Sequence, residues 1–208
     1  MPIQRLAFVA PLDEDDDVEW DADGGWCHVV AGHPFVAFAA EQGWESMPLP
    51  ESYEDGDRAV CAWRTADGTL VRLTLDTVIA VTLVELQGDS TTATEAMIRS
   101  VWECRTCAEA LSMLALVSTL GTAQARRELR SLAATGPADP DPRVVRAVEA
   151  AVHDARPAVR SEAMTVVRYL KWQEFRPSVE HLVRVEADDA VGSNTRFLLD
   201  MMRQAAGT

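Results

Sequence analysis

The chain has 208 residues, with 19 Lys plus Arg against 33 Asp plus Glu and a net charge of −14. This length predicts one large domain or two small ones, and a composition that is 48% hydrophobic and 25% charged excludes a disordered or fibrous chain. The charge divides unevenly, because residues 1–88 hold four basic and 17 acidic side chains while residues 89–208 hold 15 and 16.

No part of the sequence predicts export or a membrane span. The apolar run near Met1 is cut short by the acidic residues from Asp13 on, so it lacks the long apolar centre of a secretory signal. The most apolar stretches, residues 78–86 and 111–120, are each about half the ~20 residues that a membrane helix needs. The four cysteines have no framework spacing, which favours reduced thiols. A set of 18 Arg beside one Lys is typical of a GC-rich bacterial genome, and we expect a cytoplasmic protein.

The first half of the chain predicts mainly β-strands. Residues 3–10 and 26–31 are short apolar runs bounded by Pro, Gly and Asp, with an acidic loop between them. Residues 58–64 and 70–75 alternate polar and apolar side chains on either side of Ala66-Asp67-Gly68, which supplies the turn chemistry of a hairpin.

Residues 77–86 are rich in β-branched side chains and predict a third strand beside this hairpin. Residues 34–42 predict a short helix, with a proline in its first turn and Gly43 at its end, and residues 45–57 predict a loop. We therefore expect residues 1–88 to form a small, acidic, β-rich domain.

After Gly88 the pattern changes to that of helices. Apolar and small side chains recur at three- and four-residue steps from Met97 through Cys104 to Ala115, which predicts one long amphipathic helix or two abutting ones. Four or five shorter helices follow, divided by Pro, Gly and Asp at regular intervals. Residues 89–208 are therefore predicted to form an all-α domain, and the expected fold class is α+β.

A shift of the chain by 35 residues against itself aligns Pro142 with Pro177 and Asp154 with Asp189, and it keeps the apolar positions in phase. A helix pair repeated at this period buries its apolar stripe by stacking on its neighbours, as in an α-solenoid. The runs at 139–147 and 153–163 combine an Asp-rich turn with a following Pro and a Val-Arg pair, and they resemble the HEAT-repeat signature.

The resemblance covers roughly residues 107–205, and the N-terminal part carries no such likeness. It implies a curved stack of helix pairs that binds a partner along one face. It also implies that Arg160 pairs with turn carboxylates such as Asp154. The last repeat departs from the pattern, since Thr195 or Asn194 stands in place of the arginine.

Acidic and aromatic residues in the first half, and arginines in the second, are the candidate binding residues. Eight of the eleven residues from Asp13 to Asp23 are acidic, so they face either water or a basic partner. Four tryptophans, Trp20, Trp26, Trp44 and Trp63, lie in the acidic half; each suits the core of a small sheet, and tryptophan beside an acidic loop is also typical of a binding hot spot. Arginines that share one helical face suit phosphate or an acidic peptide. The predicted partner-binding residues are Asp13, Glu14, Asp15, Asp16, Asp17, Glu19, Trp20, Asp21, Asp23, Trp26, Arg143 and Arg146.

The sequence offers only partial metal motifs. Cys27, His28 and His33 are possible zinc ligands, and Cys104 and Cys107 have ligand spacing. Small core residues on a helical stripe explain the second pair better. The loop at 19–24 copies the first half of a calcium loop, but the position that should close it holds no glutamate. We expect no metal and no cofactor, and the zinc alternative at the first site stays open.

These patterns favour binding over chemistry. His153 and His181 stand near turns with no serine or cysteine placed to be activated, so no catalytic residue is predicted. The expected function is a non-catalytic adaptor or inhibitor that holds a basic protein with its acidic domain and its helical face. An immunity protein that neutralises a toxin is a sharper version. A HEAT-like DNA-repair or lyase-type enzyme is the alternative, and the charge of −14 makes nucleic acid an unlikely partner.

Overall fold

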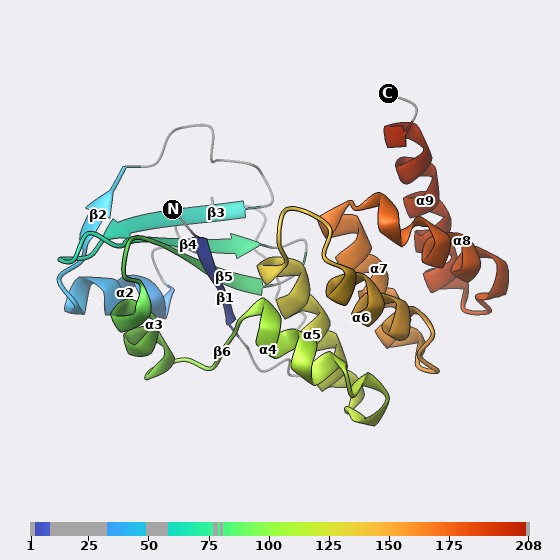
Figure 1. The fold of residues 1–208 in the computed structure, drawn as a ribbon, viewed down its shortest axis with the longest axis horizontal. Coiled ribbons are helices and arrows are strands. Elements are labelled where there is room, and N and C mark those ends of the chain that lie inside the picture. The colour runs from blue at the N-terminus through green and yellow to red at the C-terminus, as the bar shows by residue number, and fades with distance from the viewer. Residues whose placement is uncertain (1–2, 9–32, 49–57, 77–78, 80, 207–208) are drawn as a thin grey trace. The chain divides into compact units, whose positions relative to one another are not determined.

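The computed structural model describes residues 3–8, 33–48, 58–76, 79 and 81–206. The chain divides into two compact units, Met1–Thr106 and Cys107–Thr208. The first holds an antiparallel sheet and the second holds packed helices, so the predicted α+β class is confirmed (Figure 1). Among the described residues, no helix combines the length and the apolar character needed to cross a bilayer.

Within the described residues, the sheet of the first unit has six strands in the order β2-β3-β4-β5-β1-β6. Every neighbouring pair is antiparallel. Consecutive strands are neighbours from β2 to β5, and the first strand of the chain lies between β5 and β6. The strands are β1 (Ile3–Phe8), β2 (Glu45–Met47), β3 (Arg58–Arg64), β4 (Leu70–Asp76), β5 (Val81–Gln87) and β6 (Cys104–Arg105).

The predicted hairpin is present as β3 and β4, with Arg64 opposite Leu70. Gly68 has a φ of 84°, a conformation that a side chain disfavours, and the Asp67 carboxylate accepts hydrogen bonds from the Thr65 hydroxyl and the Thr69 amide. These bonds hold the turn closed. The predicted third strand is β5, which pairs with β4 along its length.

Two helices, α2 (Pro34–Glu41) and α3 (Thr92–Arg99), contribute to the core on one face of this sheet. At its centre, Phe35 is fully buried and its ring lies 5.3 to 6.0 Å from the rings of neighbouring aromatic residues. These neighbours are Phe8, Phe38, Trp44, Trp63 and Trp102. Trp44 and Trp63 are thus core residues rather than surface hot spots.

Two sequence predictions in this unit are wrong. The stripe from Met97 to Ala115 forms neither one long helix nor two abutting ones, because the chain leaves α3 after Arg99 and Cys104 lies in β6, opposite Phe8. Trp102 packs on the aromatic core in this break, so burial of its ring competes with the helical pattern. The predicted loop at 45–57 begins with strand β2, which pairs with β3. The rest of that loop and the predicted strand at 26–31 lie outside the described residues.

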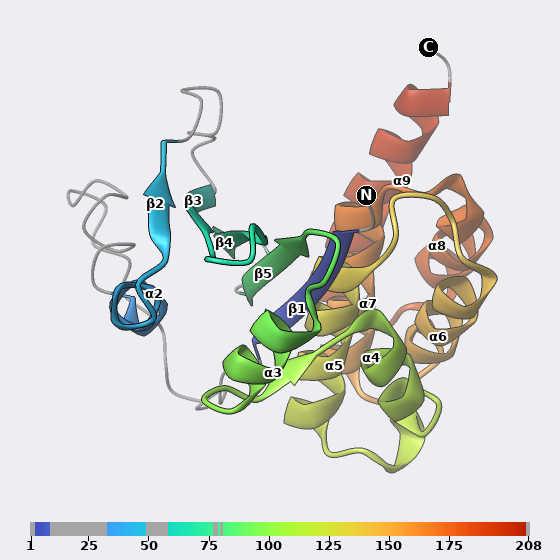
Figure 2. The same cartoon turned by 60° about the vertical axis from the view of Figure 1, so that its left-hand side comes forward.

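The second unit is a stack of three helix pairs, joined by short turns (Figure 2). One row contains α4, α6 and α8, and the other contains α5, α7 and α9. This unit begins at Cys107, after β6, whereas the sequence predicts a boundary at 88/89. Ile98 of α3 packs in the core of the first unit, and β6 pairs with β1. The bounds are α4 (Cys107–Leu114), η2 (Val117–Thr119), α5 (Thr122–Thr135), α6 (Pro142–Val152), α7 (Pro157–Leu170), η3 (Gln173–Phe175), α8 (Arg176–Val185) and α9 (Asp189–Ala206).

Apolar side chains between the two rows form the core of this unit, among them fully buried Leu129, Val148, Val159 and Val166. The buried carboxylate of Glu162 on α7 is neutralised by two arginines of α5, Arg126 at 3.2 Å and Arg130 at 3.0 Å. A carboxylate in this position would be costly without such partners.

Trp172 links the connection between α7 and α8 to the connection between α5 and α6. Its indole N–H donates to the carbonyl of Ala138, which lies between α5 and α6, and its ring stacks on Phe175 at 5.4 Å. The indole is 5% exposed. This bond links successive helix pairs at the side opposite the turns within the pairs.

Candidate functional site

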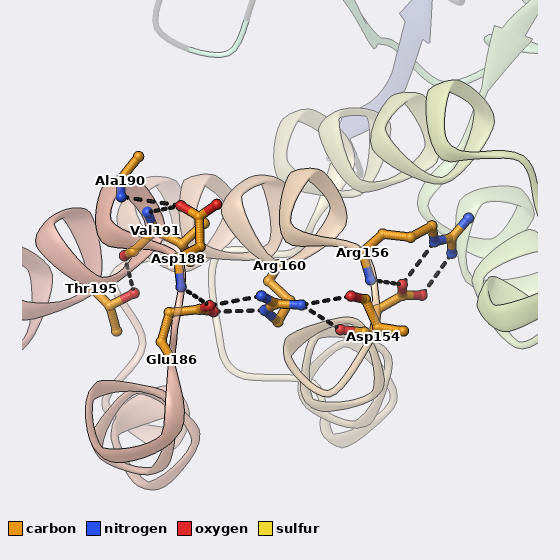
Figure 3. A network of polar contacts seen from close by, with 9 residues as sticks. Asp154, Arg156, Arg160, Glu186, Asp188, Ala190, Val191 and Thr195 are labelled. Atoms are coloured by element: carbon orange, nitrogen blue, oxygen red, sulfur yellow. Dashed lines mark hydrogen bonds and ion pairs between the residues drawn. The ribbon is translucent and has the colours of Figure 1, made fainter.

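The turn between α6 and α7 is held by an Asp-x-Arg motif. The Asp154 carboxylate accepts the backbone N–H of Arg156 at 2.9 Å and two hydrogen bonds from its guanidinium, at 2.7 and 2.6 Å (Figure 3). The guanidinium lowers the pKa of Asp154 below its ordinary value. Arg156 also donates to the carbonyls of Leu120 and Val117, so it joins this turn to the preceding one.

Arg160 extends the same network to the turn between α8 and α9. It donates to the backbone carbonyls of Asp154 and Ala155, at 3.0 and 2.9 Å, and forms a two-pronged ion pair with Glu186 at 2.6 and 2.7 Å. Arg160 thus pairs with a turn carboxylate, as the resemblance implies, but the carboxylate is that of Glu186 and not that of Asp154. Arg156 occupies that carboxylate, and Arg160 takes the next turn's glutamate.

The network ends at the last helix pair, where the sequence has Thr195 or Asn194 in place of the repeat's arginine. Asp188 accepts the N–H groups of Ala190 and Val191 and so has the capping role that Asp154 has one pair earlier. This is one residue before Asp189, which the 35-residue shift predicts. Thr195 is buried and donates within α9, to the Val191 carbonyl, instead of reaching a further turn (Figure 3). Arg156 and Arg160 thus link the connections within the three helix pairs, α4–α5, α6–α7 and α8–α9, and their charges are used in these structural contacts.

An open groove lies between α4 and α6, the first two helices of the row that contains α4, α6 and α8. It has a volume of about 670 Å³ and is bounded by α4 and η2 on one side and by α6 on the other. Its walls are mostly small or apolar, with two arginines on the α6 side. We call it the α4–α6 groove; its lining includes Ala108, Leu111, Ser112, Ala115, Val117, Arg143, Arg146, Ala147 and Ala150.

The two predicted binding arginines, Arg143 and Arg146, therefore line the same groove, but their charges are not equally available. Arg143 repeats the Asp-x-Arg motif: Asp141 accepts its backbone N–H at 2.7 Å and its guanidinium at 2.7 to 3.2 Å. These hydrogen bonds lower the pKa of Asp141, which stays ionised and balances the charge of Arg143. Arg146 is exposed and forms no ion pair with any residue that the structure describes.

Cys104, Cys107 and His33 have structural environments. Burial, and then the charge of Asp141, raise the pKa of the Cys107 thiol, which disfavours the reactive thiolate. Cys104 is buried in β6. His33 caps α2, accepting the Phe35 N–H at 3.2 Å, and burial lowers its pKa. The described residues contain no group of three or more metal-ligating side chains, and Cys27 and His28 lie outside them.

His153 and His181 come together although the sequence places them on separate repeats. Their rings lie 4.9 Å apart, edge to face, across the C-terminal halves of α6 and α8. His153, with Val185, Asp154 and Glu186, lines a smaller groove of about 280 Å³. Both carboxylates there are already held by arginines, so this groove presents the imidazole of His153 and an apolar wall.

The predicted partner-binding residues between 13 and 26, both the acidic ones and the two tryptophans, all lie outside the described residues. The division into units nevertheless sharpens the charge argument. Residues 1–106 carry six basic and 20 acidic side chains, a net charge of −14, whereas residues 107–208 carry 13 of each. Twelve of the 20 acidic residues fall in segments 9–32 and 49–57, which contain no Lys or Arg.

Sequence reasoning did not identify the groove or the partner of Arg160. The repeated spacing of Asp141 to Arg143 and of Asp154 to Arg156 is the signal that could have assigned these arginines to their own turns. Comparison of the chain with protein-family models, with curated proteins and with solved structures finds no match. The argument for function therefore depends on the groove and on the charge distribution.

Proposed function

We propose that this protein is a non-catalytic binding protein, an adaptor or an inhibitor, that holds a basic protein partner. The observation that carries the proposal is the separation of charge between the units: one has a net charge of −14, and the other is neutral and has an open, mostly apolar groove. Dense acidic segments attract a basic surface at long range, and an apolar groove supplies contact area after docking. An immunity protein against a basic toxin is the narrower form of this proposal.

The experiment is affinity capture from a lysate of the source cells with the full chain, at about 50 mM and about 500 mM salt, followed by mass spectrometry. Screening is weak at the lower ionic strength and strong at the higher one. We expect one basic protein, retained in stoichiometric amount at low salt and lost at high salt. The control bait has the eight acidic residues between 13 and 23 changed to Asn or Gln.

Two outcomes contradict the proposal. One is that the neutralised bait retains the same protein at both salt concentrations. The other is that no protein is retained while a nucleic acid or a small molecule co-purifies, which would favour the DNA-repair or lyase-type alternative.

A further inference from the structure

The α4–α6 groove has the walls of a helix-binding site. Ala108 and Ser112 on α4 and Ala115 just after it follow at steps of four and three residues, and Ala147 and Ala150 on α6 line the opposite wall. Short side chains on both walls let a third helix approach closely, with Leu111 available to pack against its apolar stripe. The smaller groove of about 280 Å³ lies elsewhere, at the turns that follow α6 and α8, and it offers no such row of small side chains.

The groove extends into further exposed apolar surface. Leu116 lies in the connection from α4 to η2 and is 60% exposed, and its chain neighbours Ala115 and Val117 both line the groove. An exposed leucine beside an apolar groove adds contact area for a partner.

The charge at the groove selects the partner's side chains. Asp141 balances Arg143, so Arg146 supplies the excess positive charge on the α6 wall. An arginine at the edge of an apolar surface pairs well with a carboxylate and repels a second cation. The groove therefore complements an acidic and apolar segment, whereas the N-terminal segments complement a basic one.

We infer that the α4–α6 groove receives an amphipathic helix of the protein partner, with an apolar stripe over Leu111 and an Asp or Glu that pairs with Arg146. This inference rests on the proposed function and adds a second contact with the same partner, at the α4–α6 groove. A single partner then has a basic surface for the acidic segments and an acidic, apolar helix for the groove.

The test is a selection from a displayed library of random 16-residue peptides on the full chain, with the eight acidic residues between 13 and 23 changed to Asn or Gln so that this segment selects no basic peptides. Selected peptides are then measured against the variants Arg146→Glu and Ala150→Trp. Both substituted side chains are exposed on α6, so the variants should fold. The matched control is Arg184→Glu, which makes the same charge reversal on the exposed surface of α8, away from the groove.

We expect the selected peptides to carry apolar residues at three- and four-residue spacing together with Asp or Glu. Their affinity should fall about tenfold with Arg146→Glu, because an attraction becomes a repulsion, and should fall similarly when Ala150→Trp fills the groove. Arg184→Glu should leave it unchanged.

Three results overturn the inference: no peptide is enriched, the enriched peptides are basic, or their affinity is the same for all three variants. The two proposals fail separately. A captured partner that binds Arg146→Glu as tightly as the wild type removes the groove contact and leaves the proposed function in place. Failure to capture any protein removes the proposed function itself.

Discussion

Replacing Arg160 with methionine is the most informative perturbation of the helical stack. Arg160 donates two hydrogen bonds to Glu186 and two to backbone carbonyls of the α6–α7 turn. It thereby links the α6–α7 pair to the α8–α9 pair. Methionine keeps much of the aliphatic stem and removes the charge and all four bonds. Glu186, whose side chain is 1% exposed, then loses its counter-charge.

Removing one member of a fully buried ion pair costs about 3–5 kcal/mol. Here the Asp188 N–H still donates to Glu186, at 2.9 Å, and the Arg160 side chain is 15% exposed, so water can reach the site. We therefore expect the free energy of unfolding of the α8–α9 pair to fall by about 2 kcal/mol, which corresponds to about 30-fold faster hydrogen exchange of its protected amides.

The pH dependence gives the same argument a second readout. The Arg160 hydrogen bonds lower the pKa of Glu186, so this group stabilises the fold above its ordinary pKa and the contribution is lost as pH falls through the lowered value. The difference between wild type and Arg160→Met should be full at pH 7 and should shrink below the ordinary pKa of glutamate. Hydrogen exchange monitored by mass spectrometry measures the effect at pH 7, and denaturant unfolding compares the two proteins at about pH 3.

The control is Arg168→Met, the same substitution at an exposed position of the same helix, which should change stability by less than about 0.5 kcal/mol. Two results refute the reasoning. One is an Arg160→Met effect no larger than that of Arg168→Met, and the other is an effect at pH 7 that persists undiminished at low pH.

Three further substitutions test other parts of the fold. Trp172→Phe keeps the stacked ring but leaves the Ala138 carbonyl without its donor, so the free energy of unfolding should fall by about 1–2 kcal/mol in denaturant titration; no change would show that the bond is dispensable. Phe35→Ala leaves a cavity among the aromatic rings of the first unit and should lower its free energy of unfolding by about 3–5 kcal/mol. The dispersed methyl and aromatic NMR signals of the first unit should then be lost. If the signals of α5 to α9 also vanish, the prediction that the second unit keeps its own core is contradicted. Gly68→Ala places a side chain at a φ of 84° and should cost about 1–2 kcal/mol by thermal unfolding, with Gly121→Ala, at a negative φ, as the control that should cost less.

Local patterns predicted those elements whose sequence and packing agree. The hairpin around Asp67 and Gly68 has both the alternation of its strands and the turn residues that a positive φ requires, and it is present. The helices α6 and α7 begin at Pro142 and Pro157, after capping or turn aspartates, as proline and Asp favour. The HEAT-repeat resemblance of this region stays a prediction.

Long-range packing decided what the patterns could not. The stripe through Cys104 has helical spacing, but pairing with β1 and burial of Trp102 break the helix, and neither partner is near in sequence. The same holds for the site. The sequence predicts Arg143 and Arg146 as a pair of helical cations, but which of them is balanced depends on Asp141, and the groove depends on how α4 packs beside α6. A single sequence carries no direct record of such distances.

The most direct test of the proposed function is the association rate of the captured partner, measured across a salt series for the wild type and for the chain with neutralised residues 13–23. Electrostatic steering raises association rates by roughly tenfold to a thousandfold and weakens steeply with ionic strength. The proposal predicts fast, salt-sensitive association for the wild type and slow, nearly salt-independent association for the neutralised chain. Equal rates with equal salt dependence for the two proteins would contradict it.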